Sequence, residues 1–241
     1  MLKPFEYAYF VVALIEIFAE ATGNEMVRFF TKPLLMVVLV AFYMQAVAGK
    51  WNAVHKLITV AFVFAWVGDV ALMFVGNASE TLMGIPKNPN FFLLGLVGFL
   101  LTHILYAVAF TKVSDKKSAA LLPGKFWVVV PLLIYMAALL SMLLPSIYQN
   151  DLTKPFLVPV IVYSMAIATM VLLSINRYRR VNDKSFVLVF SGALLFMFSD
   201  TIIAVNKFVH PFGSSGIFIM VLYILGQYLI AKGCLAQFDR E

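Results

Sequence analysis

The sequence predicts an all-α polytopic membrane protein with about eight transmembrane helices, forming a single integral membrane domain over residues 1–241. Of the 241 residues, 63% are hydrophobic and 12% are charged, and the mean hydropathy is +0.95. A soluble domain is nearer half apolar and a quarter charged. Apolar stretches of about 20 residues, the length that crosses a bilayer, recur along the whole chain with short connections between them. The single Cys234 excludes a disulfide framework and a cysteine metal cluster. These observations exclude a cytosolic enzyme, a nucleic-acid-binding module and a disordered chain.

The expected spans follow the apolar stretches in order. They cover residues 5–21, 30–48, 57–75, 91–110, 126–144, 156–175, 186–205 and 214–231. The fourth and the sixth contain no Asp, Glu, Lys or Arg, which makes them the clearest. The first contains Glu6, Glu16 and Glu20, and its Lys3 and Ala19-Glu20-Ala21 match the start and the cleavage site of a signal peptide. We expect it to be retained, because Glu16 interrupts the apolar core that a signal peptide needs.

Lys and Arg residues accumulate in alternate connections. The second, fourth and sixth connections carry ten of them: Lys50, Lys56, Lys112, Lys116, Lys117, Lys125, Arg177, Arg179, Arg180 and Lys184. The other connections carry five: Arg28, Lys32, Lys87, Lys154 and Lys207. Cytoplasmic loops of membrane proteins are enriched in Lys and Arg, so the richer side is expected to be cytoplasmic. Both termini, with Lys3 and Arg240, fall on that side, and the net charge of +6 requires no nucleic-acid partner.

Two short motifs occur once in each half of the chain. Lys32-Pro33 opens the second span and Lys154-Pro155 the sixth, while Asp69 lies in the third span and Asp200 in the seventh. Four spans separate the members of each pair, so the two halves would cross the membrane in the same direction. We therefore expect two parallel four-helix repeats, residues 1–111 and 125–241; chance recurrence of a common Lys-Pro pair is the alternative.

Charged and polar side chains gather in the outer third of the expected membrane. They are Glu16, Lys32, Asp69, Tyr163, Asp200 and Lys207. At about 1.5 Å per residue, Asp69 lies roughly 9 Å below the outer boundary. An intramembrane charge costs at least ~2.5–3.5 kcal/mol, so Asp69 and Asp200 are expected to face a cavity or a partner. Structural roles compete for the others: Glu16 could accept a hydrogen bond between helices, and the two lysines could anchor the chain at the interface.

Other polar residues leave two interpretations open. His103 shares a helix face with Phe99 and Tyr106, and either orients a neighbour or takes part in chemistry. Tyr223 and Gln227, at i and i+4, either line the same cavity or bond between helices. The remaining histidines do not join them, since His55 is expected in a cytoplasmic loop and His210 in an outer one. A zinc site needs three or four ligands around one ion, so we expect no metal.

Two neighbouring acids in apolar surroundings suit acid catalysis. Burial favours the neutral form of a carboxyl group, and a second acid nearby keeps the two in different protonation states. One acid can then donate a proton while the other stabilises an oxocarbenium-like cation or activates water. A lysine at the headgroup level can hold a phosphate. An amphiphile with a phosphate head and an acid-labile bond just below it matches this arrangement.

A series of short motifs runs from the second span to the eighth. They are Lys32-Pro33, Gly68-Asp69-x-x-Leu72-Met73, Phe99-x-x-x-His103-x-x-Tyr106, Pro159-Val160-x-x-Tyr163, Gly192-Ala193, Ser199-Asp200, Ala204-x-x-Lys207-Phe208, and Gln227 with Leu229-Ile230. In this order and spacing the sequence resembles the YhhN-like family of membrane proteins, the lysoplasmalogenases. Gly226 departs from the pattern, where alanine is expected.

The resemblance implies hydrolysis of the vinyl ether of lysoplasmalogens, giving a fatty aldehyde and glycerophosphoethanolamine or glycerophosphocholine. It implies Asp69 and Asp200 as the catalytic acid/base pair, with no cofactor and with a lysophospholipid and the bilayer as partners. The substrate-binding residues would be Lys32, Lys207, Tyr163, His103, Glu16, Gln227 and Tyr223. Two other classes are weighed beside this one: a proton-coupled small-solute transporter using the same acids, and a non-catalytic lipid-binding or assembly subunit. The compact chain favours the bacterial inner membrane, or the endoplasmic reticulum in a eukaryotic host.

Overall fold

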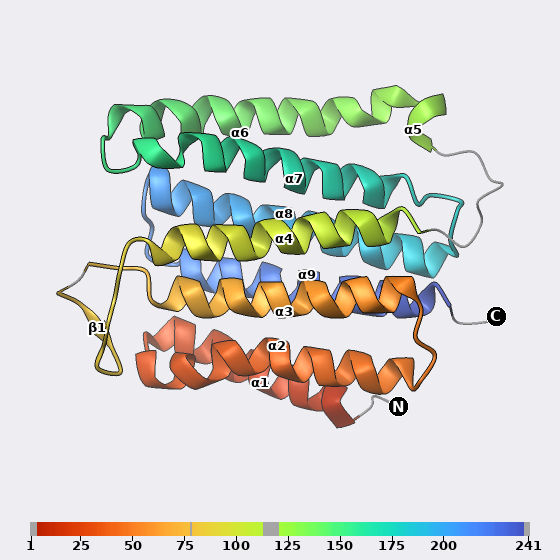
Figure 1. The fold of residues 1–241 in the computed structure, drawn as a ribbon, viewed down its shortest axis with the longest axis horizontal. Helices are drawn as coiled ribbons and strands as arrows, with labels where there is room; N and C mark the ends of the chain where they lie inside the picture. Colours follow the sequence, from red (N-terminus) through yellow and green to blue (C-terminus); the bar gives the residue numbers. More distant parts are fainter. Residues whose placement is uncertain (1–3, 78, 113–120, 239–241) are drawn as a thin grey trace. The chain divides into compact units, whose positions relative to one another are not determined.

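The computed structural model describes residues 4–77, 79–112 and 121–238. Lys3, Lys116, Lys117 and Arg240, whose charges enter the predicted orientation, lie outside the described residues. The chain divides into two compact units, Met1–Leu105 and Tyr106–Glu241. Apart from one small hairpin, the described regular structure is helical (Figure 1), which confirms the all-α prediction.

The first unit contains three complete helices, a hairpin and most of a fourth helix. They are α1 (Pro4–Thr22), α2 (Glu25–Val47), α3 (Ala53–Met73), β1 (Thr81–Leu82), β2 (Ile85–Pro86) and α4 (Phe91–Phe110). Side-chain caps define the starts of α2 and α3. The Asn24 side chain accepts a hydrogen bond from the backbone N–H of Val27, and that of Asn52 accepts one from His55. In sequence order, α1 packs on α2 and α2 packs on α3.

Small residues bring α3 and α4 close together. A Cβ atom added to Gly98 would lie 2.9 Å from the backbone nitrogen of Gly68, so the two backbones are almost in contact there. The buried Thr102 hydroxyl donates to the carbonyl oxygen of Ala61 on α3 at 3.1 Å. Close packing at small residues, aided by an interhelical hydrogen bond, is typical of helices in membranes. It fixes the rotation of α3 about its own axis, and with it the direction of Asp69, the residue after Gly68.

The connection between α3 and α4 forms a hairpin that the sequence analysis does not anticipate. Its two-residue strands are antiparallel, with Leu82 opposite Ile85. Met83 and Gly84 have φ angles of 51° and 79°, as in the type I′ turns that match strand twist. Leu82 is buried, whereas Met83 and Ile85 are exposed.

The second unit begins within α4 and contains the longest described helix, α8. Its further elements are α5 (Leu121–Gly124), η1 (Phe126–Val129), α6 (Val130–Gln149), η2 (Lys154–Phe156), α7 (Leu157–Ile175), α8 (Asp183–Phe208) and α9 (Ser215–Ala236). Helices α8 and α9 form the most extensive pair in the unit. A Cβ atom on Gly192 of α8 would lie 2.8 Å from the carbonyl oxygen of Gly226 on α9. Gly226, the position where the family pattern led us to expect alanine, thus lies at this close approach.

A buried arginine ties several helix ends of the second unit together. Arg177, between α7 and α8, is fully buried, and its Nη2 donates to Ser185 Oγ at 2.8 Å and to Gln237 Oε1 at 3.1 Å. Gln237 in turn donates to the carbonyl oxygen of Lys112 at 2.7 Å. Burial lowers the pKa of the Arg177 guanidinium below its usual value, because desolvation disfavours the charged form. The guanidinium therefore links the ends of α4, α8 and α9.

Seven of the described helices are long and apolar enough to cross a membrane, as expected of an integral membrane protein. They are α2, α3, α4, α8 and α9, together with Phe126–Gln149, which joins η1 to α6, and Lys154–Ile175, which joins η2 to α7. Helix α1 is not among the seven and carries Glu6, Glu16 and Glu20. An eighth crossing by α1, the parallel repeats and the cytoplasmic termini stay predictions.

Two local expectations need correction or refinement. The loop position expected for His55 is wrong, because α3 begins at Ala53 and His55 lies in its first turn. There His55 is buried, with Nδ1 2.9 Å from the Tyr43 hydroxyl. The two Lys-Pro pairs also differ locally, since Lys32 lies inside α2 whereas Lys154 begins the short helix η2.

Candidate functional site

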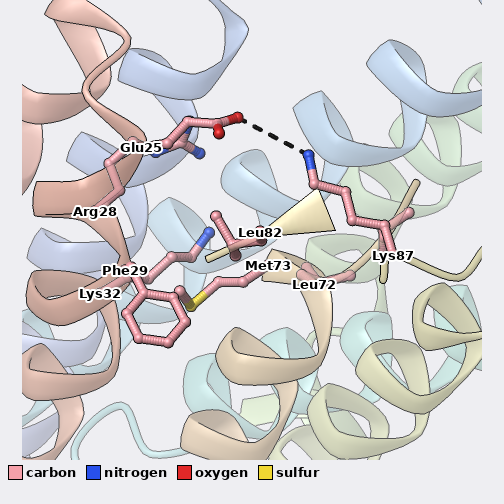
Figure 2. A pocket seen from close by; sticks show the side chains of 9 residues that line it. Glu25, Arg28, Phe29, Lys32, Leu72, Met73, Leu82 and Lys87 are labelled. Atoms are coloured by element: carbon pink, nitrogen blue, oxygen red, sulfur yellow. Dashed lines mark ion pairs between the residues drawn. The ribbon is translucent and has the colours of Figure 1, made fainter. Parts of the chain in front are cut away.

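The first unit contains a pocket where the start of α2, the end of α3 and the hairpin meet. Its volume is about 170 Å³. The lining residues are Glu25, Arg28, Phe29, Lys32, Leu72, Met73, Val75, Leu82 and Lys87. Figure 2 shows these side chains reaching from α2 on one side and from the hairpin segment on the other. The pocket therefore combines several charged groups with an apolar wall.

One face of α2 supplies much of the lining. Glu25, Arg28, Phe29 and Lys32 have the spacing i, i+3, i+4 and i+7, which places them on a single helix face. They extend over about 10.5 Å of the helix axis. Polar and charged groups thus follow one another in a row, beginning at the first turn of α2 and continuing toward its middle.

The charges of the pocket are unevenly paired. Arg28 Nε lies 2.5 Å from Glu20 Oε2, and Lys87 Nζ lies 3.5 Å from Glu80 and 3.9 Å from Glu25. Lys32 is half-buried, and no ion pair of Lys32 occurs among the residues that the structure describes. Its acidic neighbour Glu16 acts on it electrostatically without forming an ion pair. A lysine without an ion pair, beside an apolar wall, suits the anionic head of an amphiphile.

Asp69 lies close to this pocket along α3. It precedes Leu72 by three residues and Met73 by four, so it occupies the same face about one helical turn, or roughly 5 Å, farther along. Only 3% of its surface is exposed. Lys32 thus lines the pocket and Asp69 lies one turn beyond its apolar wall, while the roles of both residues stay predictions.

Glu16 joins α1 to α2 and interacts electrostatically with Lys32. It is fully buried, and its Oε2 accepts a hydrogen bond from the Thr31 hydroxyl. Its Oε1 has no hydrogen-bond partner within the described part of the chain. Glu16 therefore makes the interhelical hydrogen bond that was its structural alternative, immediately beside Lys32.

In the second unit, the Tyr163 hydroxyl on α7 donates to Oδ2 of Asp200 on α8, at 2.5 Å. Asp200 is buried, with 8% of its surface exposed. The hydroxyl of the next residue, Thr201, forms a hydrogen bond with the Tyr135 hydroxyl at 2.6 Å. Lys207 follows Asp200 by seven residues, about 10.5 Å along the same face of α8, and is exposed. Tyr163 and Asp200, two of the six residues expected to gather, are therefore in direct contact, and the gathering of all six stays a prediction.

Gln227 and Tyr223 lie in the core of the second unit. The Tyr106 hydroxyl donates to Gln227 Oε1, which joins the end of α4 to α9. Tyr223 packs edge-on against Phe196, with ring centroids 5.5 Å apart. Gln227 Nε2 is buried and has no hydrogen-bond partner within the part of the chain that the structure describes. His103 is fully buried in the α4 part of the first unit.

Comparison with known proteins identifies the family. Residues 27–234, from the first turn of α2 almost to the end of α9, match the model of the YhhN family. The chain belongs to the YhhN family. Neither the curated proteins nor the solved structures contain a significant match. The matched region includes Lys32, Asp69, Tyr163 and Asp200 but leaves out α1, so Glu16 lies outside the matched residues.

The two acids of this YhhN protein lie in different units, Asp69 in the first and Asp200 in the second. Their facing one another stays a prediction, as does a joint phosphate site of Lys32 and Lys207. Each acid has its own surroundings within its unit: the pocket near Asp69, and the tyrosine hydroxyl on Asp200.

Sequence reasoning missed three charged residues of the pocket: Glu25, Arg28 and Lys87. It counted Arg28 and Lys87 only as loop charges, because the second span was expected to begin at residue 30. The spacing of Glu25, Arg28 and Lys32 was nevertheless a readable signal, since it is the period of one helix face. Lys87 had no such signal, because the hairpin that positions it depends on a turn of two residues with positive φ.

Proposed function

We propose that this YhhN-family protein is a membrane-embedded hydrolase that cleaves the vinyl ether bond of lysoplasmalogens. The products are a fatty aldehyde and glycerophosphoethanolamine or glycerophosphocholine. Family membership carries the proposal, because this is the activity that the resemblance to lysoplasmalogenases implies. The buried acids and the cationic pocket support it with chemistry of the right kind.

The reaction needs an acid and a means of stabilising positive charge. Protonation of the vinyl carbon that does not bear oxygen converts the ether into an oxocarbenium ion. Water adds to the cationic carbon and loses a proton, giving a hemiacetal. The hemiacetal hydroxyl then loses its proton as the bond to the glycerol oxygen breaks, and the glycerol oxygen takes up a proton, so that the aldehyde and the glycerol alcohol are released. A carboxylic acid and a carboxylate together supply the proton and the negative charge that these steps require.

Asp69 and Asp200 would form this pair. The hydrogen bond from Tyr163 restricts the orientation of the Asp200 carboxyl group, so Tyr163 is a positioning residue in the proposal. We assign to Asp200 the carboxylate role, because the phenol donates to it, and to Asp69 the role of proton donor. Lys32, which lines the pocket near Asp69, would hold the phosphate.

The test uses the purified full chain in detergent with lysoplasmenylethanolamine, following aldehyde release by mass spectrometry. Asp69→Asn and Asp200→Asn should each lower the rate by about 10²–10⁴-fold, because each removes one partner of the acid/base pair. Asp151→Asn changes an exposed acid outside the site and serves as the matched control. Alkyl-ether and acyl lysolipids run in parallel and should not be cleaved. Full activity in both site variants would refute the mechanism.

The same assay separates the hydrolase from the alternative classes. If folded protein cleaves none of these lipids, the intramembrane acids would instead favour a proton-coupled transporter. Flux of a small solute into proteoliposomes, stopped by Asp200→Asn, would then be the supporting result. A protein that binds lipid but has neither activity would belong to the non-catalytic class.

A further inference from the structure

We propose that the pocket of the first unit binds a phosphoethanolamine headgroup, with Lys32 and Arg28 on the phosphate and the Glu25 carboxylate on the primary ammonium. The inference rests on the proposed function in taking a lipid as the substrate. It goes beyond that function by naming the headgroup that is preferred and the residue that selects it.

The balance of charges in the pocket is the first argument. Three cationic residues and one acidic residue line it, and Glu20 and Glu80 lie beside two of the cations, Arg28 and Lys87. In the described residues Lys32 makes no ion pair, and the buried Glu16 acts on it electrostatically without forming one. A phosphate between Lys32 and Arg28 would give the lysine a direct ionic partner, and the guanidinium can donate to two phosphate oxygens at once.

The availability of Glu25 is the second argument. Its side chain is 61% exposed, and its ion pair with Lys87 is long, at 3.9 Å. Lys87 lies nearer to Glu80, at 3.5 Å, so it keeps an acidic partner when Glu25 turns to a ligand. A carboxylate within a pocket that also binds phosphate makes the site complementary to a zwitterion rather than to a simple anion.

The nature of the ammonium follows from what surrounds it. A primary ammonium donates three hydrogen bonds and pairs strongly with a carboxylate, whereas a trimethylammonium group has no hydrogen to donate. Sites for quaternary ammonium use several aromatic rings as a cage. Among the residues that the structure describes, Phe29 is the single aromatic one lining this pocket. The chemistry therefore favours ethanolamine over choline.

The order of the groups along the helices agrees with the order of groups in the lipid. Glu25, Arg28 and Lys32 follow one another down α2, and Asp69 lies beyond the apolar wall on α3. A lysoplasmalogen presents its ammonium, phosphate, glycerol and vinyl ether in that sequence. With its ammonium at Glu25 and its phosphate at Lys32, the vinyl ether is directed toward the depth of Asp69.

The experiment measures binding without catalysis, using the full chain in detergent and a 1-O-alkyl lysophosphoethanolamine, which lacks the vinyl group. The same alkyl lipid is tested with a choline head and with a bare phosphate head. Glu25→Gln should lower the affinity for the ethanolamine lipid by about tenfold and change the affinity for the phosphate-only lipid by no more than about twofold. Lys32→Gln should lower the affinity for all three lipids by about tenfold. Asp151→Asn and Lys154→Gln, changes to an acid and to the other Lys-Pro lysine outside the pocket, are the matched controls.

Two results would overturn the site: equal effects of Glu25→Gln on the ethanolamine and phosphate-only lipids, or no effect of Lys32→Gln on any lipid. Diacyl phosphatidylethanolamine and free glycerophosphoethanolamine are tested in the same way. Whichever ligand binds more tightly in a Glu25-dependent manner is the molecule that brings the headgroup to the pocket. Headgroup binding that depends on Glu25, without aldehyde release in the hydrolase assay, would reject the proposed function and keep the pocket. Aldehyde release together with a headgroup preference that does not depend on Glu25 would support the proposed function and reject the headgroup site.

Discussion

Among single residues, Asp200 is notable for the tyrosine hydroxyl that donates a hydrogen bond to its carboxyl group. Tyr163 reaches it from the neighbouring helix, and both lie within one unit. We predict that Tyr163→Phe lowers kcat for aldehyde release by about 10- to 100-fold with little change in KM, because the carboxyl group loses its fixed orientation while the lipid site stays intact. Steady-state kinetics on the purified variant provide the measurement. Tyr148→Phe, which removes an exposed hydroxyl, should behave as the wild type.

A double-mutant cycle identifies the route by which Tyr163 acts. If its hydroxyl acts through Asp200, Tyr163→Phe should have no further effect in the Asp200→Asn background. Losses that multiply in the double variant would show that the tyrosine acts on substrate or fold independently of Asp200.

Sequence reasoning could identify single residues where burial made a charge costly. Asp69 and Asp200 were found because an acid flanked by apolar residues needs a reason to be there. Lys32 was found through its Lys-Pro motif, and it does line the pocket. Glu25 was not found, because a charged residue ahead of an apolar stretch is ordinary. Only its position above Arg28 and Lys32 on the folded helix gives it a role.

The closest contacts between helices are made at glycine residues. Gly192 and Gly226 allow α8 and α9 to approach closely. We predict that Gly192→Ala destabilises the protein by about 1–3 kcal/mol, since two of the three atoms that its Cβ would approach within 3 Å, the Gly226 carbonyl oxygen and the Ile230 nitrogen, belong to the backbone of α9. The thermal unfolding midpoint in detergent should fall accordingly. Gly213→Ala, where a Cβ would meet nothing within 4 Å, should leave the midpoint unchanged. Equal midpoints for both variants would contradict the close packing.

The helices themselves were largely predictable, and their ends were not. The fourth expected span, 91–110, coincides with α4, because its apolar run is bounded by polar loops. The seventh was expected at 186–205, but α8 extends over Asp183–Phe208. Its first turn is polar and capped by Asn182, which accepts from the Ser185 N–H at 2.7 Å. An apolar window does not detect such a turn. The hairpin escaped for a similar reason, since strands of two residues leave no periodic pattern.

Properties of the whole molecule agree with a lipid environment. Large apolar side chains are exposed on several helices, among them Leu14, Ile134, Val158 and Met165. In water such surfaces would aggregate, whereas hydrocarbon accommodates them. Phe126–Gln149, the least buried of the candidate spans, has a mean hydropathy of 2.4. Membrane insertion therefore accounts for the surface as well as for the composition.

The single cysteine allows the predicted orientation to be tested directly. Cys234 is fully buried, so the wild-type chain should react poorly with a membrane-impermeant maleimide in intact cells. New cysteines at Met83 or Asp151, in connections expected outside, should be labelled in intact cells, because both positions are exposed. Trp51→Cys and Lys184→Cys, on the Lys- and Arg-rich side, should react only after permeabilisation. Phe5→Cys should also need permeabilisation if α1 crosses the membrane. Labelling of Phe5→Cys in intact cells would leave seven crossings, and opposite sidedness of Met83 and Asp151 would reject the parallel repeats.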